Sequence, residues 1–91
     1  MKILAVFNTP GMTSAQYDLC ISELEKAGLG SPSGRLSHVC GIDQNRCFVT
    51  DVWASEAQFA AFGETLMPIL QRIGVQVSEP MVIPYYNEIG G

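Results

Sequence analysis

The order in which strand-like and helix-like patterns follow one another constrains the fold of this chain more than any other feature of its sequence. Residues 2–8 are apolar and β-compatible, and they end at the turn signal Thr9-Pro10-Gly11. A helical periodicity follows. Thr13 and Gln16 have the spacing of a capping box at its start, and Gly28 stands where a helix commonly ends.

A hairpin is predicted in the middle of the chain. After a loop at 29–34, residues 35–42 and 47–54 form two strand-like runs. The segment between them, Asp43-Gln44-Asn45-Arg46, is polar and suits a tight turn. The two runs should therefore pair with each other as antiparallel strands.

A second helical pattern begins after Ser55, with Gln58 at the capping-box position, and ends at Gly74. Pro68 lies inside this pattern. Because proline removes a backbone N–H and clashes with the preceding turn, we expect a kink or a short break near Met67.

The last strand-like run covers residues 81–86, and Pro84 inside it predicts an edge strand because proline cannot donate to a ladder.

Two right-handed βαβ crossovers joined by a hairpin give the βαββαβ order of the ferredoxin-like fold. We therefore predict an α+β fold, with one domain over residues 1–91. Its four-stranded antiparallel sheet should carry both helices on one face.

Composition restricts the possible partners of such a sheet. Charged residues make up 15% of the chain and apolar residues 47%, whereas about 25% charge is usual in a soluble domain. Since large apolar patches are rarely left bare, we expect a homodimer that covers the free face of the sheet. The net charge of −4, with five Lys and Arg, provides no basic cluster for nucleic acid or for a membrane surface. With no export signal in the first residues, we expect a cytoplasmic location.

Most kinds of cofactor site lack the residues that they need. The single histidine and the unclustered carboxylates provide too few ligands for a metal, and no glycine-rich loop has phosphate-binding spacing. Three cysteines, an odd number without close pairing, are expected to be free thiols that pack as small apolar residues. The sequence therefore predicts no metal and no cofactor.

One stretch of the chain has a recognisable pattern. Val49-Thr50-Asp51-Val52-Trp53-Ala54-Ser55-Glu56-Ala57-Gln58-Phe59 combines an acidic residue, a Trp at a strand end and a Ser-capped helix with an early aromatic. With Phe62 and Leu66-Met67-Pro68 further on, it resembles the dimeric α+β barrel superfamily, in particular antibiotic-biosynthesis-monooxygenase-like proteins. The resemblance covers nearly the whole chain by the order and length of its elements.

The resemblance implies a homodimer of facing sheets, with a pocket between each sheet and its own helices. It also implies, for the monooxygenase members, oxidation of polycyclic aromatics without metal or flavin, while other members degrade haem. This chain has no second histidine for haem ligation. Of the Asn–Trp–Arg arrangement linked to anthrone oxidation, only Trp53 can be placed.

Hairpin geometry predicts a pair of polar residues on one face. If Ile42 pairs with Cys47 across the turn, His38 lies opposite Asp51, and opposed residues of antiparallel strands point to the same face. The same register places six residues together beneath the helices: Leu36, His38, Cys40, Val49, Asp51 and Trp53. A slip of one residue would separate His38 from Asp51.

These residue types suit acid/base chemistry. An aspartate beside a histidine fixes its tautomer and favours the protonated ring, as in an oriented general base. We predict His38 as the base, Asp51 as its orienting partner and Trp53 as a wall of the pocket. The alternative is a hydrogen-bonded pair that only satisfies two polar groups. A Cys40–His38 nucleophilic pair is less suitable, because residues two apart on a strand are distant from each other.

Four further residues are candidates for the substrate pocket. Tyr17 lies on the inward face of the first helix, and its hydroxyl is within reach of either a ligand or a backbone group. Phe59 and Phe62 are core residues that can also serve as pocket walls. Asn8 ends the first strand and is a candidate for the pocket mouth.

Three functions are consistent with these features. The first is a cofactor-independent monooxygenase-like protein that acts on a small hydrophobic or aromatic substrate through His38 and Asp51. The second is a non-catalytic module that binds a small hydrophobic ligand in the same pocket. The third is a structural or regulatory homodimer with a filled core.

Overall fold

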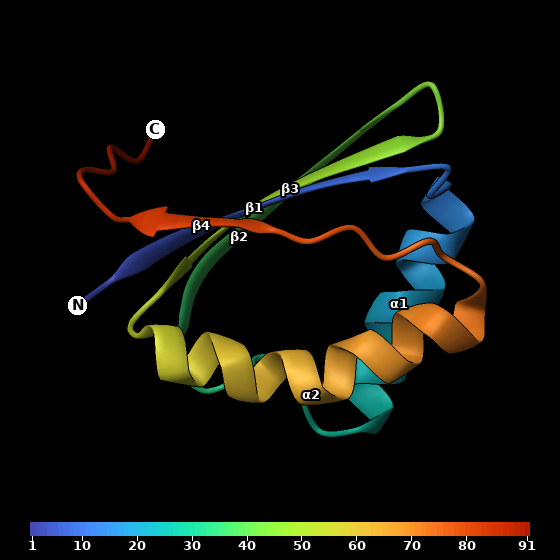
Figure 1. Cartoon of the computed structure of the whole chain (residues 1–91), viewed down its shortest axis with the longest axis horizontal. Coiled ribbons are helices and arrows are strands. Elements are labelled where there is room, and N and C mark those ends of the chain that lie inside the picture. Colours follow the sequence, from blue (N-terminus) through green and yellow to red (C-terminus); the bar gives the residue numbers. More distant parts are fainter.

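The computed structural model describes all residues, 1–91, and contains the six predicted elements in the predicted order. These are β1 (Ile3–Pro10), α1 (Ser14–Lys26), β2 (Arg35–Asp43), β3 (Arg46–Trp53), α2 (Glu56–Ile73) and β4 (Met81–Pro84). The strands form one antiparallel sheet in the order β2-β3-β1-β4, and both helices lie on one face of it (Figure 1). The prediction of a ferredoxin-like α+β fold is confirmed.

The two helices begin where the capping residues predict. In α1, Thr13 accepts a bond from the Gln16 backbone N–H and donates its own N–H to the Gln16 side chain, which completes the capping box. In α2, Ser55 accepts from the backbone N–H of Gln58 in the same way. The Gln58 side chain, however, interacts with the Ser33 and Ser55 hydroxyls, so this second box is only half formed.

Helix α2 continues through Pro68 without a break, so of the kink or short break predicted near Met67, the break does not occur. A proline removes only one intrahelical hydrogen bond, at a cost of about 3 kcal/mol. Burial of an apolar side chain contributes about 1.5–3 kcal/mol each, and α2 buries four of them on either side of Pro68. These are Phe62, Leu66, Ile69 and Leu70. Packing therefore outweighs the local defect.

The predicted hairpin is confirmed, with a turn shorter than expected. Only Gln44 and Asn45 lie outside the strands, and both have positive φ angles of 50° and 58°. This is the conformation of a two-residue type I′ turn, whose twist matches that of the strands. The turn places His38 opposite Asp51, as predicted.

A β-bulge changes the register at the other end of β2. Arg35 pairs with Trp53 and Ser37 pairs with Val52, so Leu36 is the additional residue between them. The predicted pairing of Leu36 with Trp53 is therefore wrong. Leu36 is 54% exposed, and Arg35 takes its place on the face that the helices cover.

The first and last strands, β1 and β4, also differ in length from the prediction. β1 continues past Asn8 to Pro10, because Thr9 and Pro10 still pair with β3. β4 is an edge strand, as Pro84 predicts, but it ends at Pro84 instead of residue 86.

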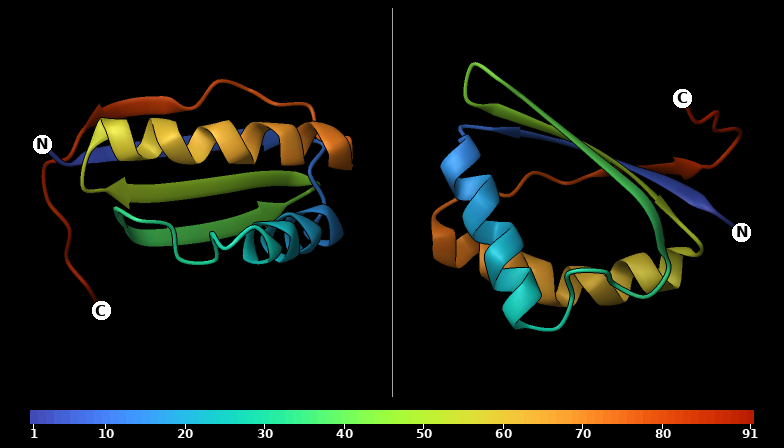
Figure 2. Two further views of the ribbon diagram at one scale, coloured as in Figure 1. Left: turned by 90° about the horizontal axis from the view of Figure 1, so that it is seen from below. Right: turned by 180° about the vertical axis from the view of Figure 1, so that it is seen from behind.

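The sheet has an inner face, which the helices cover, and an outer face, which is free (Figure 2). The core lies between the inner face and the helices, and Trp53, with no exposed surface, is its largest fully buried side chain. The outer face is apolar although it is exposed. Its exposed apolar side chains include Val39, Phe48, Met81 and Ile83.

None of the helices combines the length and the apolar character needed to cross a membrane.

Candidate functional site

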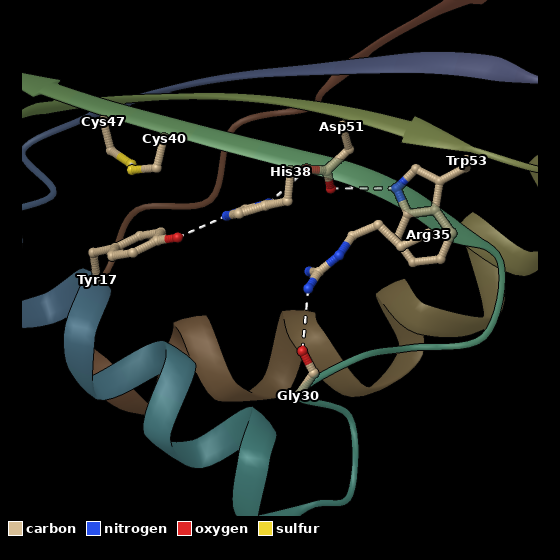
Figure 3. Close-up of polar contacts among 8 residues, drawn as sticks. All are labelled: Tyr17, Gly30, Arg35, His38, Cys40, Cys47, Asp51 and Trp53. Carbon is tan, nitrogen blue, oxygen red and sulfur yellow. Dashed lines mark hydrogen bonds and ion pairs between the residues drawn. The ribbon is translucent and has the colours of Figure 1, made fainter. Parts of the chain in front are cut away.

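A series of hydrogen bonds links one side chain of α1 to three side chains on the inner face of the sheet (Figure 3). The Tyr17 hydroxyl lies 2.6 Å from Nε2 of His38, and Nδ1 of His38 lies 2.6 Å from Oδ1 of Asp51. The indole Nε1 of Trp53 donates to the other carboxylate oxygen, Oδ2, at 3.2 Å. The order of the chain is therefore Tyr17–His38–Asp51–Trp53.

Local geometry explains how these four hydrogen-bonded side chains come together. His38 and Asp51 are opposite each other on β2 and β3, and Trp53 follows Asp51 by two residues, on the same face of β3. Tyr17 belongs to α1 and reaches the sheet from the helix layer. His38, Asp51 and Trp53 are thus placed by strand register, and Tyr17 is placed by helix packing.

Burial makes these contacts energetically important. The Asp51 side chain is 3% exposed, and an unpaired carboxylate there would be costly. Because His38 and Trp53 each donate to one of its oxygens, the carboxylate is fully satisfied. The His38 side chain, by contrast, is 22% exposed, so a ligand can reach the ring from solvent.

The chemistry of the partners determines where the protons lie. A carboxylate only accepts hydrogen bonds, so Nδ1 of His38 carries the proton shared with Asp51. In the neutral ring, Nε2 is then the acceptor for the Tyr17 hydroxyl. Burial raises the pKa of Tyr17 to about 12, so its hydroxyl keeps its proton near neutral pH. His38 is therefore the proton acceptor of the chain, with Tyr17 as its hydroxyl partner.

A cavity of about 60 Å³ lies between the inner face and the helices, beside the hydrogen-bonded Tyr17, His38 and Asp51. Eleven of its fifteen lining residues are hydrophobic, and the others are Thr9, Arg35, His38 and Asp51. A volume of about 150 Å³ encloses a benzene ring, so an aromatic ring enters this cavity only if its lining moves. Met12, which also lines the cavity, is the most adaptable side chain there.

Four of the seven residues predicted for the site line this cavity. They are Tyr17, His38, Asp51 and Phe62. Trp53 and Phe59 do not, so their predicted roles as pocket walls are wrong. Trp53 lies behind Asp51, and Phe59 packs edge-on against Trp53 with 5.6 Å between ring centroids. Both residues support the site from the core.

Asn8 lies on the outer face, so its predicted place at the pocket mouth is also wrong. It pairs with Phe48 on the neighbouring strand. Its side chain points away from the cavity, because its two neighbours Phe7 and Thr9 point into it. Its side-chain oxygen accepts a hydrogen bond from Arg46 at 2.8 Å. The strict alternation of side chains along β1 excludes Asn8 from the cavity.

The cysteines pack within the core region, as the sequence predicts. Cys40 and Cys47 are diagonal neighbours on the hairpin, with 3.6 Å between their sulfur atoms, and all three cysteines are free. Burial raises the pKa of Cys47 to about 12 and also raises the pKa of Cys20. These two thiols therefore stay protonated near neutral pH and are not activated nucleophiles.

Arg35 lines the cavity, and the sequence alone did not identify it. An ideal register would point Leu36 inward instead. The bulge that exchanges the two residues has no glycine or proline to signal it. Arg35 provides the only basic side chain of the cavity besides His38.

Several known structures with the same arrangement of elements are described as antibiotic biosynthesis monooxygenases or monooxygenases. A proposed antibiotic biosynthesis monooxygenase from Chloroflexus aurantiacus superposes with a TM-score of 0.69 and 20% identity over 99% of this chain and 98% of that one. Another from Deinococcus radiodurans superposes with a TM-score of 0.64 and 12% identity, over 99% and 97%.

A third structure is the Streptomyces coelicolor monooxygenase from ActVA-Orf6, in complex with nanaomycin D. It superposes with a TM-score of 0.57 and 12% identity, over 99% of this chain and 92% of that one. No family model and no curated protein sequence matches the chain. The resemblance inferred from the sequence is therefore confirmed as a shared fold, the ferredoxin-like α+β fold of antibiotic-biosynthesis-monooxygenase-like proteins.

Proposed function

We propose that this chain is a cofactor-independent monooxygenase-like protein that oxidises a small hydrophobic or aromatic substrate. The observation that carries the proposal is the Tyr17–His38–Asp51 chain at the edge of an apolar cavity. An oriented histidine beside an apolar site is suited to removing a proton from an activated C–H bond or a phenol. His38 and Asp51 form the acid/base pair.

The first step of the reaction is proton removal. Because Nε2 of His38 is engaged by Tyr17, the substrate proton passes to the Tyr17 oxygen as the hydroxyl proton moves to Nε2. The imidazolium that forms is stabilised by Asp51, in the manner of a base held by a third group. The substrate becomes a carbanion or its enolate form, in a site where apolar walls strengthen the interaction between charges.

Dioxygen is the oxidant, and the atoms and electrons of the reaction balance for a substrate with a reactive CH₂ group. The carbanion gives an electron pair to dioxygen, forms a C–O bond and takes back one proton, which gives a hydroperoxide. Removal of the second C–H proton forms the carbonyl while the O–O bond breaks. The hydroxide that leaves combines with that proton, so CH₂ and O₂ become C=O and H₂O.

Oxygen uptake with a panel of anthrones and quinols tests this function. We expect uptake by the unaltered chain, and a fall in kcat of about a hundredfold or more in His38→Gln, the usual scale of general acid–base catalysis. Ser37→Ala is the matched control, because Ser37 is the neighbouring residue on the outer face of β2. Ligand binding without oxygen uptake would instead identify the non-catalytic binding module, and a chain that does neither would be a structural or regulatory dimer.

We also propose that the outer face is the interface of a homodimer. Val39, Phe48, Met81 and Ile83 form an exposed apolar surface that a second copy of the same sheet can cover. Measurement of molecular mass in solution should give twice the mass of the chain, and Phe48→Asp should reduce it to that of one chain. A single-chain mass for the unaltered protein contradicts the proposal. The cytoplasmic location stays a prediction of the sequence.

A further inference from the structure

The β-bulge in β2 places a cation at the cavity. Arg35 occupies the inward position opposite Trp53 that regular alternation would give to Leu36. Its side chain extends from β2 into the space between the sheet and the helices, on the same side as His38 and Asp51 (Figure 3). Bulges often redirect a side chain next to a functional site.

The guanidinium of Arg35 has no acidic partner. Its one hydrogen bond goes to the carbonyl oxygen of Gly30 at 3.2 Å. The single ion pair of the protein joins His38 and Asp51, and both oxygens of that carboxylate are already engaged. Since a guanidinium has five N–H donors, most of those of Arg35 are free for a ligand.

We propose that Arg35 is a specificity-determining residue, which selects apolar ligands that carry a carboxylate. The planar guanidinium binds a carboxylate through two parallel hydrogen bonds, while the apolar lining of the cavity receives the rest of the molecule. This inference rests on the proposed function, because it takes the cavity to be the ligand site. It adds the chemical class of the ligand and the residue that recognises it.

The electrostatics of the rest of the chain favours this assignment. The net charge is −4, so the surface as a whole repels anions. Arg35 also acts on the neighbouring site, since its charge opposes the rise in the pKa of Tyr17 that burial produces. The same field stabilises a negative charge on a bound molecule. Inside the cavity, an anionic group of a ligand is thus attracted to Arg35.

Binding of benzoate and benzamide to the full chain tests the inference. The two probes have nearly the same shape and differ in charge, and NMR titration reports the affinity of each. We expect benzoate to bind about five to ten times more tightly, the scale of one charge-assisted pair at a partly exposed site. Arg35→Gln should remove this preference, and it should lower the affinity for benzoate more than the affinity for benzamide.

Arg46→Gln is the matched control. It removes the same charge from the outer face, where Arg46 contacts Asn8, and should keep the preference for benzoate. Equal binding of the two probes, or a preference that survives in Arg35→Gln, overturns the inference but leaves the cavity as a ligand site. Binding of neither probe overturns both the inference and the proposed ligand site.

Discussion

Each face of the sheet carries some side chains that its surroundings would not suggest. The inner face is covered by helices, yet it contains a histidine, a carboxylate and an arginine. The outer face is free, yet Val39 and Phe48 are exposed on it, at 68% and 44%. Ordinary burial rules place polar groups in water and large apolar patches out of it.

The difference shows that the two faces are stabilised in different ways. On the inner face, hydrogen bonds compensate the burial of Asp51, and every buried polar side-chain atom has a partner. On the outer face, nothing within one chain compensates the exposed apolar groups. The inner face is thus complete within one chain, whereas the outer face is complete only with the proposed second copy.

The largest expected difference between the faces is in the cost of removing an aromatic ring. Trp53→Ala should lower the free energy of unfolding by about 3–5 kcal/mol, because it leaves a cavity in the core. It also removes the N–H that binds Asp51. Phe48→Ala, on the outer face, should cost less than about 1 kcal/mol when measured at a concentration where the chain is monomeric. Urea unfolding of the two variants gives both values.

A third variant separates packing from hydrogen bonding at the inner aromatic. Trp53→Phe keeps most of the ring but leaves Oδ2 of Asp51 without its donor, which should cost about 1–3 kcal/mol. If Trp53→Ala and Phe48→Ala cost the same, the distinction drawn between the faces is wrong.

Alkaline pH should weaken the inner face selectively. The folded protein holds the Tyr17 and Cys47 protons up to a pKa of about 12, whereas the unfolded chain releases them near 10.0 and 9.0. Above about pH 9 the folded state therefore binds more protons than the unfolded state, so stability falls as the pH rises towards 12. Thermal unfolding across this range should show the decline.

Tyr17→Phe tests the contribution of the hydroxyl to that decline. This variant should lose stability less steeply between pH 10 and 12, because only Cys47 and Cys20 still have raised pKa values. Tyr86→Phe is the matched control, since Tyr86 is 98% exposed, and its profile should equal that of the unaltered chain. Identical profiles for all three proteins would contradict a half-buried, protonated Tyr17.

Local patterns were sufficient for the fold and for the central pair of the site. A two-residue turn fixes the register of a hairpin, so the pairing of His38 with Asp51 followed from the position of the polar turn segment. The capping residues likewise placed the start of both helices. These features depend on residues that are close in the sequence.

The remainder of the site depends on contacts that local patterns do not encode. Tyr17 meets His38 across 21 residues of sequence, through the packing of α1 on the sheet. The bulge at Leu36, which brings Arg35 inward, has no turn residue to mark it. Trp53 was correctly placed on the inner face, but its position behind Asp51 depends on the tertiary arrangement of the core.

The smallest expected effect concerns Asn8, on the outer side of the strand whose other side lines the cavity. Asn8→Ala removes an exposed hydrogen bond with Arg46 and should change the free energy of unfolding by no more than about 0.5 kcal/mol. Oxygen uptake and benzoate binding should not change either, because the side chain points away from the cavity. A loss of ligand binding in Asn8→Ala, with stability intact, would mean that the ligand reaches the outer face. The two faces would then share one function, and the separation between an inner site and an outer interface would have to be abandoned.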